Sequence, residues 1–248
     1  MAKIHRRELL FSGAAGMVGG AAGFFGHRHF RRFPRGATPS YSQSGEDVTA
    51  KMIFDYLGIK QPSYLDIGAW LPQAGNNTYL FYTLGGRGVL VEPNVALISE
   101  LKSVRPGDTV LNVGIGITEQ KEADYYCLTI DQWNTFDKEE AERVAALSKT
   151  KIEKVVKIPL APINNVIETH FHGKAPDFIS IDVEGLDVPI MKTLDFQRFR
   201  PKLICAETLV ALTFNMDPAM TEFLSRQGYE ARAVTFPNTI YVDKSLVK

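Results

Sequence analysis

Four apolar segments of this chain run into carboxylates, and this pattern constrains the fold more than any other feature. The segments are Tyr64–Ala69, Gly88–Pro93, Asp177–Asp187 and Lys202–Glu207. An apolar run that stops at a turn signal is typical of a strand buried on both faces of a parallel sheet. Helical patterns separate these runs, which predicts right-handed crossovers and an α/β fold.

The acids at the ends of these segments are expected to share one place in the fold. They are Asp66, Glu92, Asp182 with Glu184, and Glu207. Open α/β folds bind their ligands at the carboxyl edge of the sheet, where parallel strands end together. Buried acids cost desolvation energy unless cationic or hydrogen-bonding groups meet them. One acidic loop could be incidental, but acids after several strands predict a ligand-binding crevice.

Length and charge divide the chain into a basic leader and a larger domain. The 248 residues, 45% hydrophobic and 23% charged, suit one α/β domain with an appendage. Residues 1–40 carry seven basic residues against one acid, so a formal charge of +6 leaves −6 on the rest. We therefore expect a leader and linker at 1–40 and the folded domain at 41–248. An acidic body argues against nucleic acid as a partner.

The leader contains an uncharged run, Leu9–Phe25, with basic residues on both sides. Its length lies at the lower limit for a membrane span, and its Gly and Ala content makes it weakly hydrophobic. Arg6 and Arg7 also resemble a twin-arginine export signal. A membrane anchor is the preferred interpretation, with an export signal or neither as the alternatives.

Helix and strand signals place the remaining elements. Ser44 and Asp47 resemble a capping box that begins a helix. Residues 117–157 are the least regular part and are interpreted as an insertion that covers the active site. Two helices are expected from their apolar stripes, which are Val48, Met52, Ile53, Tyr56, Leu57 and Val95, Ile98, Leu101, Val104, and a third short helix from a cap at Asn76 or Asn77. Within the insertion, a strand is expected at Tyr125–Thr129 and a helix from Asp137 to about Leu147. Further helices are expected at Ile163–Phe171, at Asp187–Leu194 and from Asp217 to before Gly228, followed by a final hairpin of Tyr229–Val234 and Thr239–Val242.

The positions of the acids indicate a nucleoside ligand. An acid after the second strand can accept both ribose hydroxyls, as Glu92 would. The residues after Asp66 lack the G-x-G-x-x-G spacing that holds a pyrophosphate, and no P-loop lysine follows. A nucleoside without phosphates is therefore favoured. S-adenosylmethionine fits, because its ammonium and sulfonium groups are cationic and suit acidic surroundings.

Six motifs together resemble the FkbM family of S-adenosylmethionine-dependent methyltransferases. They are SQSGED at 42–47, YLDIGA at 64–69, NNT at 76–78, GVLVEPN at 88–94, LNVGIG at 111–116 and SIDVEGLD at 180–187. The resemblance spans roughly residues 41–207 in the family's order. It implies the class I methyltransferase (Rossmann-like) sheet, mostly parallel with an antiparallel C-terminal hairpin, and a methyltransferase domain at 41–248.

The same resemblance implies the cofactor-binding residues. Asp66, Gly68 and Ala69 match the first motif, and Glu92 matches the ribose-binding acid. Asp182 and Glu184 match the acids nearest the sulfonium and the acceptor. The full set implied for the cofactor is Gln43, Glu46, Asp66, Gly68, Ala69, Asn77, Thr78, Glu92, Pro93, Asn112, Val113 and Asp182. The first-motif loop departs from the family in lacking a second close glycine and in carrying Trp70.

Methyl transfer to a hydroxyl requires a base, and Asp182 and Glu184 are the predicted catalytic residues. The expected acceptor is a small molecule, a sugar or a lipid-linked group. A divalent metal held by Asp182, Glu184 and Asp187 is an alternative, but close acids around a turn are common without one, so no metal is expected.

Two other functions stay open at this point. A nicotinamide-dependent oxidoreductase is disfavoured by the missing glycine fingerprint. A membrane-attached, catalytically inactive nucleoside-binding protein is disfavoured by the acids at the strand ends. Because S-adenosylmethionine is held in the cytoplasm, the domain is expected to be cytoplasmic, with possible membrane association through residues 9–25.

Overall fold

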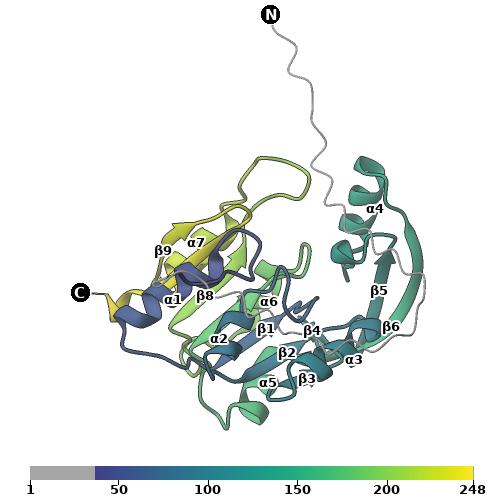
Figure 1. Ribbon diagram of the computed structural model, residues 1–248. Coiled ribbons are helices and arrows are strands. Elements are labelled where there is room, and N and C mark those ends of the chain that lie inside the picture. The colour runs from purple at the N-terminus through teal and green to yellow at the C-terminus, as the bar shows by residue number, and fades with distance from the viewer. Residues whose placement is uncertain (1–36, 248) are drawn as a thin grey trace, which may run out of the picture. The chain divides into compact units, whose positions relative to one another are not determined.

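The computed structural model describes residues 37–247, which fold around a seven-stranded sheet (Figure 1). The strand order is β3 (Thr109–Leu111), β2 (Gly88–Val91), β1 (Tyr64–Ile67), β7 (Phe178–Ile181), β8 (Leu203–Glu207), β10 (Asn238–Asp243) and β9 (Tyr229–Val234). The first five strands are parallel, and β10 runs antiparallel to both β8 and β9. This is the predicted Rossmann-like methyltransferase sheet, with its antiparallel C-terminal hairpin.

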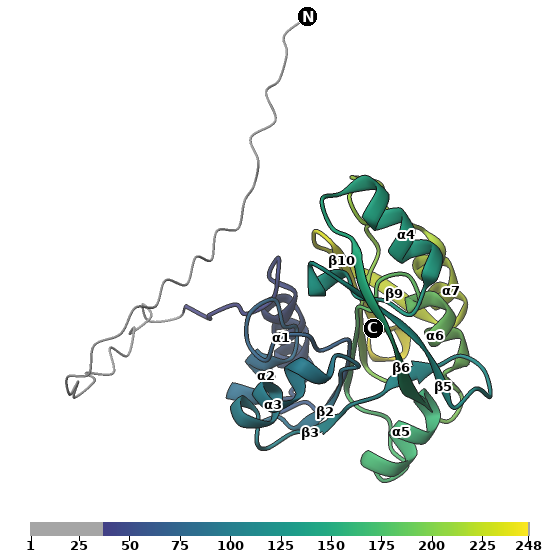
Figure 2. The same cartoon turned by 90° about the vertical axis from the view of Figure 1, so that its right-hand side faces the viewer.

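Helices cover both faces of the sheet, as Figure 2 shows. One face packs on α1 (Glu46–Tyr56), α2 (Tyr79–Thr83) and α3 (Val95–Val104). The other packs on α5 (Ile163–His170), α6 (Asp187–Thr193) and α7 (Ala219–Arg226). Every residue of β1 and β7 is buried, because apolar side chains alternate between two covered faces. This two-sided burial explains the continuous apolar runs in the sequence.

The strand register brings the strand-ending acids to one edge. Ile67 at the end of β1 pairs with Val91 of β2 and with Ile181 of β7. Ile181 in turn pairs with Ala206, which precedes Glu207 on β8. Four parallel strands therefore end level with one another. The predicted convergence of the acids is confirmed.

Residues 114–162 form a second, smaller sheet beside the first (Figure 1). Its strands are β4 (Gly114–Gly116), β6 (Ile152–Pro162) and β5 (Glu122–Leu128), with η1 (Asp131–Trp133) and α4 (Lys138–Leu147) between β5 and β6. Asp137 caps α4 as predicted, accepting hydrogen bonds from the amides of Glu139 and Glu140. The sequence analysis missed β6, because this mostly exposed strand of mixed charge is stabilised by antiparallel pairing with β5.

The prediction for the start of α1 is wrong in two respects. The N-cap is Gly45 at φ +90°, and the Ser44 hydroxyl donates to the Phe236 carbonyl instead of capping the helix. The buried positions are Ala50 and Phe54, whereas Met52 and Tyr56 are 69% and 83% exposed. The physical reason is tertiary: Glu46 and Asp47 are fully buried in polar contacts, and these contacts set the rotation of the helix.

Two other helices differ from the predicted pattern in detail. α3 buries Leu97 and Leu101, while Val95 at its start is 69% exposed. The α2 N-terminus begins at Tyr79, whose amide donates to the side chain of Asn76 at 2.8 Å. The N-cap residue of α2 is Thr78, so the predicted cap at Asn76 or Asn77 is wrong in position, although the Asn76 side chain accepts from the amides of Thr78 and Tyr79. The predicted stripe of α3 is only partly right.

The described part of the chain ends with η2 (Lys244–Leu246). The predicted apolar run Leu9–Phe25, the twin arginines and the basic flank up to Arg35 lie outside the described residues. Within residues 37–247 no helix combines the length and the apolar character needed to cross a membrane.

Candidate active site

A cavity of about 50 Å³ lies at the carboxyl edge of the sheet. Its wall includes five of the predicted site residues: Gly68, Glu92, Pro93, Asp182 and Glu184. The insertion contributes most of the opposite wall, through Tyr125, Asp131, Gln132, Asn134 and Phe136. The insertion therefore covers this edge, as the sequence analysis expected.

Glu92 follows β2 and is held by backbone amides. One carboxylate oxygen accepts from the Trp70 amide at 2.8 Å, and the other accepts from the Asn94 amide at 2.7 Å. The side chain is only 4% exposed, and burial raises the pKa of Glu92 to about 7. Each oxygen keeps a free lone pair, so the carboxylate could accept two further hydroxyl groups.

Asp66 is held from behind by a buried polar network. Its carboxylate accepts from the Thr78 hydroxyl at 2.7 Å and from the Asn76 amide group at 3.1 Å. Arg105 donates to the side chains of both Thr78 and Asn76, and it pairs with Asp108 at 2.8 Å. Neither Arg105 nor Asp108 exposes any side-chain surface. Arg105 was not predicted as part of this network, because its partners are distant in the sequence or lie in the turn after α3.

Gly68 is required by the close approach of two strands. It lies at φ +83°, and a Cβ atom there would come within 1.9 Å of the Asp182 carbonyl oxygen. No side chain can replace it without moving the end of β1 or β7. Its amide and that of Ala69 both donate to the Val91 carbonyl. The first-motif glycine thus sets the spacing of the strand ends.

Glu184 is held in a strained backbone conformation. It is a non-glycine residue at φ +54°, and its carbonyl oxygen accepts from the Thr135 hydroxyl of the insertion at 2.8 Å. Strain of this kind costs roughly 1–3 kcal/mol and persists only where the surroundings impose it. Trp70, also at positive φ, reaches the insertion through a 3.3 Å contact between its Nε1 and Asp131. These two contacts therefore hold the insertion over this edge of the sheet.

A second cavity, of about 190 Å³, adjoins the first. Glu184 lines both cavities, and Glu207 lines only the second. Oxygen atoms of Asp182, Glu184 and Glu207 all lie within 4.8 Å of one another. Glu207 was recognised in the sequence as a strand-ending acid but was not predicted as a site residue. The register of β7 and β8 is what brings it beside the other two.

The pKa values of these acids rise together. Burial, followed by the charge of Asp187, raises the pKa of Asp182 to about 7. Burial raises the pKa of Glu184 well above its usual range, and the Asp182 charge adds to the effect. Burial, followed by the charges of Asp182 and Glu184, raises the pKa of Glu207 strongly. Perturbed carboxyls that meet in a cavity are typical of functional sites.

None of the other predicted residues is part of the wall of the first cavity. Glu46 is fully buried and accepts from Thr235 and Asn238, so it ties α1 to the turn before β10. Gln43 is exposed. Asn77 donates to the hydroxyl of Ser180 at 3.1 Å. Further along the chain, Asn112 donates to the Glu92 and Pro93 carbonyls at 2.9 Å, and Val113 packs against the core.

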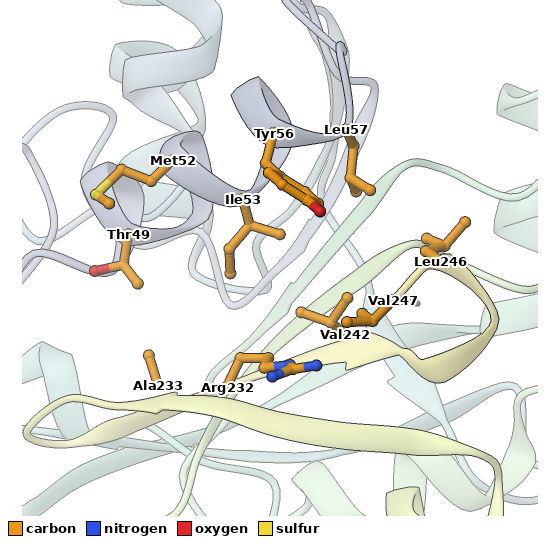
Figure 3. A pocket seen from close by; sticks show the side chains of 10 residues that line it. All are labelled: Thr49, Met52, Ile53, Tyr56, Leu57, Arg232, Ala233, Val242, Leu246 and Val247. Atoms are coloured by element: carbon orange, nitrogen blue, oxygen red, sulfur yellow. The ribbon is translucent and has the colours of Figure 1, made fainter.

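A larger cavity lies elsewhere, between α1 and the C-terminal hairpin (Figure 3). It encloses about 350 Å³, and its wall is mostly apolar, including Met52, Ile53, Tyr56 and Val242. None of the predicted site residues lines it. Size alone therefore does not identify the site, and the acids at the sheet edge do.

Comparison with known proteins gives one informative match. A family model described as a methyltransferase FkbM domain matches residues 66–231. The chain is also similar to an O-methyltransferase from Bacillus cereus in complex with SAH, at 14% identity and a TM-score of 0.43 over 82% of each chain. A TehB-like SAM-dependent methyltransferase from Corynebacterium glutamicum shares 11% identity, with a TM-score of 0.40 over 81% of this chain and 88% of that one. A search of curated proteins finds no match.

Proposed function

Because this chain belongs to the FkbM family of S-adenosylmethionine-dependent methyltransferases, we propose that it methylates a hydroxyl of a small-molecule, sugar or lipid-linked acceptor. The observation that carries the proposal is the position of Glu184, which lines two adjoining cavities. The first cavity has the donors and acceptors of a nucleoside site. The second offers space for an acceptor on the other side of the same carboxylate.

The side chains around the first cavity suit the cofactor chemically. Glu92 would accept the two ribose hydroxyls, because its oxygens are positioned by backbone amides and keep free lone pairs. Asp66 and Asp182 would face the cationic end of the cofactor. A volume of about 50 Å³ is smaller than the roughly 300 Å³ of a small-molecule site. Binding therefore requires the contact between Trp70 and Asp131 to open.

The mechanism follows from the positions of the acids. When bound, S-adenosylmethionine supplies a methyl group whose bond to sulfur breaks as the bond to the acceptor oxygen forms. Asp182 or Glu184 would take the acceptor's proton: burial raises the pKa of both carboxyls, and the value of about 7 for Asp182 suits a base that works near neutral pH. The insertion would exclude water from the reacting groups, and the rigid strand ends would hold them in line.

Replacing Glu92 with alanine should weaken cofactor binding. Losing the ribose contacts should cost about 1.5–3 kcal/mol, the scale of hydrogen bonds to a charged group. The affinity is measured by isothermal titration with S-adenosylhomocysteine. Glu100→Ala, which changes an exposed acid of α3, is the matched control and should bind as the wild type does. A folded Glu92→Ala protein with wild-type affinity would refute the ribose assignment.

The reaction itself is tested by supplying a labelled methyl donor with pools of hydroxyl-bearing metabolites, sugars and lipid-linked sugars. Label should appear on an oxygen of one acceptor class. Parallel titrations with S-adenosylhomocysteine and NAD separate this function from that of an oxidoreductase, since only the first should bind. Label found only on nitrogen or carbon would contradict the proposed hydroxyl acceptor while leaving the methyltransferase activity in place.

The location of the domain is also a proposal. Because the methyl donor is held in the cytoplasm, residues 41–248 should remain there, with residues 9–25 as a weak anchor. Alkaline phosphatase fused after Lys248 should be inactive, and the fusion should sediment with membranes. Phosphatase activity together with cleavage near residue 40 would point instead to the export signal that Arg6 and Arg7 resemble.

A further inference from the structure

Within the described part of the chain, the carboxylates of three acids where the two cavities meet have no hydrogen-bond or ion-pair partner. Among residues 37–247, no hydrogen bond or ion pair reaches the carboxylate oxygens of Asp182, Glu184 or Glu207. Arg143 is the nearest cation on this wall, but it pairs with Glu140 at 2.5 Å and donates to the Ala211 carbonyl. Three acids thus share one small volume, and Arg143, the cation on the wall of the second cavity, is already paired with another acid.

The wall of the second cavity also holds Asp187, a buried acid with an unpartnered oxygen. Asp187 is 6% exposed, and its Oδ1 has no hydrogen-bond partner. The carboxylate of Glu184, which is 9% exposed, also has none. Buried polar atoms are nearly always satisfied, so orphaned oxygens that line a cavity indicate that something else occupies it.

The geometry points to a divalent cation, and we propose that Asp182, Glu184 and Glu207 bind Mg²⁺ or a similar hard ion. Oxygens bound to Mg²⁺ or Ca²⁺ at 2.0–2.6 Å lie at most about 4–5 Å apart, which agrees with the 4.8 Å limit observed here. A ligand set made only of carboxylates favours Mg²⁺, Mn²⁺ or Ca²⁺ over zinc. Asp187 would lie close enough to support the site from behind.

From the sequence no metal is expected, and the alternative metal site consists of Asp182, Glu184 and Asp187. The structure brings Glu207 into the cluster in place of Asp187, since β8 ends beside β7. This inference rests on the proposed function for its role: a cation here would adjoin the acceptor cavity and make an acceptor hydroxyl easier to deprotonate. Each carboxylate would give one oxygen to the cation, and the second oxygen of Asp182 or Glu184 would remain to take the proton. Its binding can be measured without any acceptor.

Titration of the full-length protein with Mn²⁺, followed by electron paramagnetic resonance, tests the site. Saturable binding of one Mn²⁺, displaced by Mg²⁺, is the expected result. Glu207→Gln should weaken Mn²⁺ binding at least about tenfold, because it removes one of three charged ligands. Asp217→Asn, which removes a charge from the same cavity without touching the cluster, should change it less than about twofold.

The control outcomes distinguish this inference from the proposed function. Glu207→Gln should also raise the Tm in metal-free buffer, since it relieves repulsion, so the variant is expected to fold; Glu184→Gln replaces it if it does not. Absence of saturable Mn²⁺ binding, with or without S-adenosylhomocysteine, would overturn the metal site. The metal site would also be overturned if Glu207→Gln and Asp217→Asn weakened Mn²⁺ binding equally. Binding of S-adenosylhomocysteine alone, titrated separately, tests the methyltransferase site independently.

Discussion

Glu184→Gln should lower kcat at least about a hundredfold while leaving the affinity for S-adenosylhomocysteine nearly unchanged. The substitution keeps the shape of a side chain that lines both cavities and removes its ability to take a proton. Loss of a general base typically costs 10²–10⁴ in rate. Turnover is measured with the acceptor that the labelled-methyl screen provides, and affinity by isothermal titration.

The pH profile separates a base from a residue that only binds. In the wild type, kcat should rise with pH near neutrality, where Asp182, whose pKa burial raises to about 7, loses its proton. Glu184→Gln should shift or flatten this rise. Glu222→Gln, on the exposed side of α7, is the matched control and should behave as the wild type does. Weaker cofactor binding with normal turnover at saturation would reassign Glu184 to cofactor binding.

Arg105→Met should lower the free energy of unfolding by about 3–5 kcal/mol, the usual cost of removing one partner from a buried ion pair. The change leaves Asp108 buried without its cation, and it removes the donors that orient Asn76 and Thr78 toward Asp66. The measurement is urea unfolding, with the m-value checked for a change in mechanism. Cofactor affinity should fall too, since Asp66 loses its support.

Two further variants give this prediction its controls. Arg198→Met removes an arginine from an exposed pair with Glu168 and should cost less than about 1 kcal/mol. The double variant Arg105→Met with Asp108→Asn should be less destabilised than Arg105→Met alone, because it no longer buries an uncompensated charge. A cost below about 1 kcal/mol for Arg105→Met would show that the network around Asp66 does not depend on this ion pair.

Local patterns were sufficient for the sheet and for one part of the site. Runs such as Phe178–Ile181 are apolar except for Ser180, because both faces of each parallel strand are covered, and this leaves a clear trace in the sequence. The acids at the strand ends were predictable for the same reason, since parallel strands end at one edge. The cap at Asp137 was also predictable, because it depends on neighbouring residues.

Features that depend on distant contacts were not predictable. The rotation of α1 is set by Glu46 and Asp47, whose partners lie partly in the C-terminal hairpin, so its apolar stripe was misleading. β6 forms because β5 pairs with it, although its own residues are mostly exposed. Arg105 gave no local signal, since its partners come from the segment before α2 and from the turn after α3.

The sequence by itself determined the fold class, the edge at which the acids meet and the family, because each depends on local order along the chain. Only the tertiary structure decided which acids share a cavity. The register of β7 and β8 adds Glu207 to Asp182 and Glu184, and the insertion closes over them through Thr135. The spacing of carboxylates across neighbouring strands is a property of pairing in space, which no stretch of sequence contains.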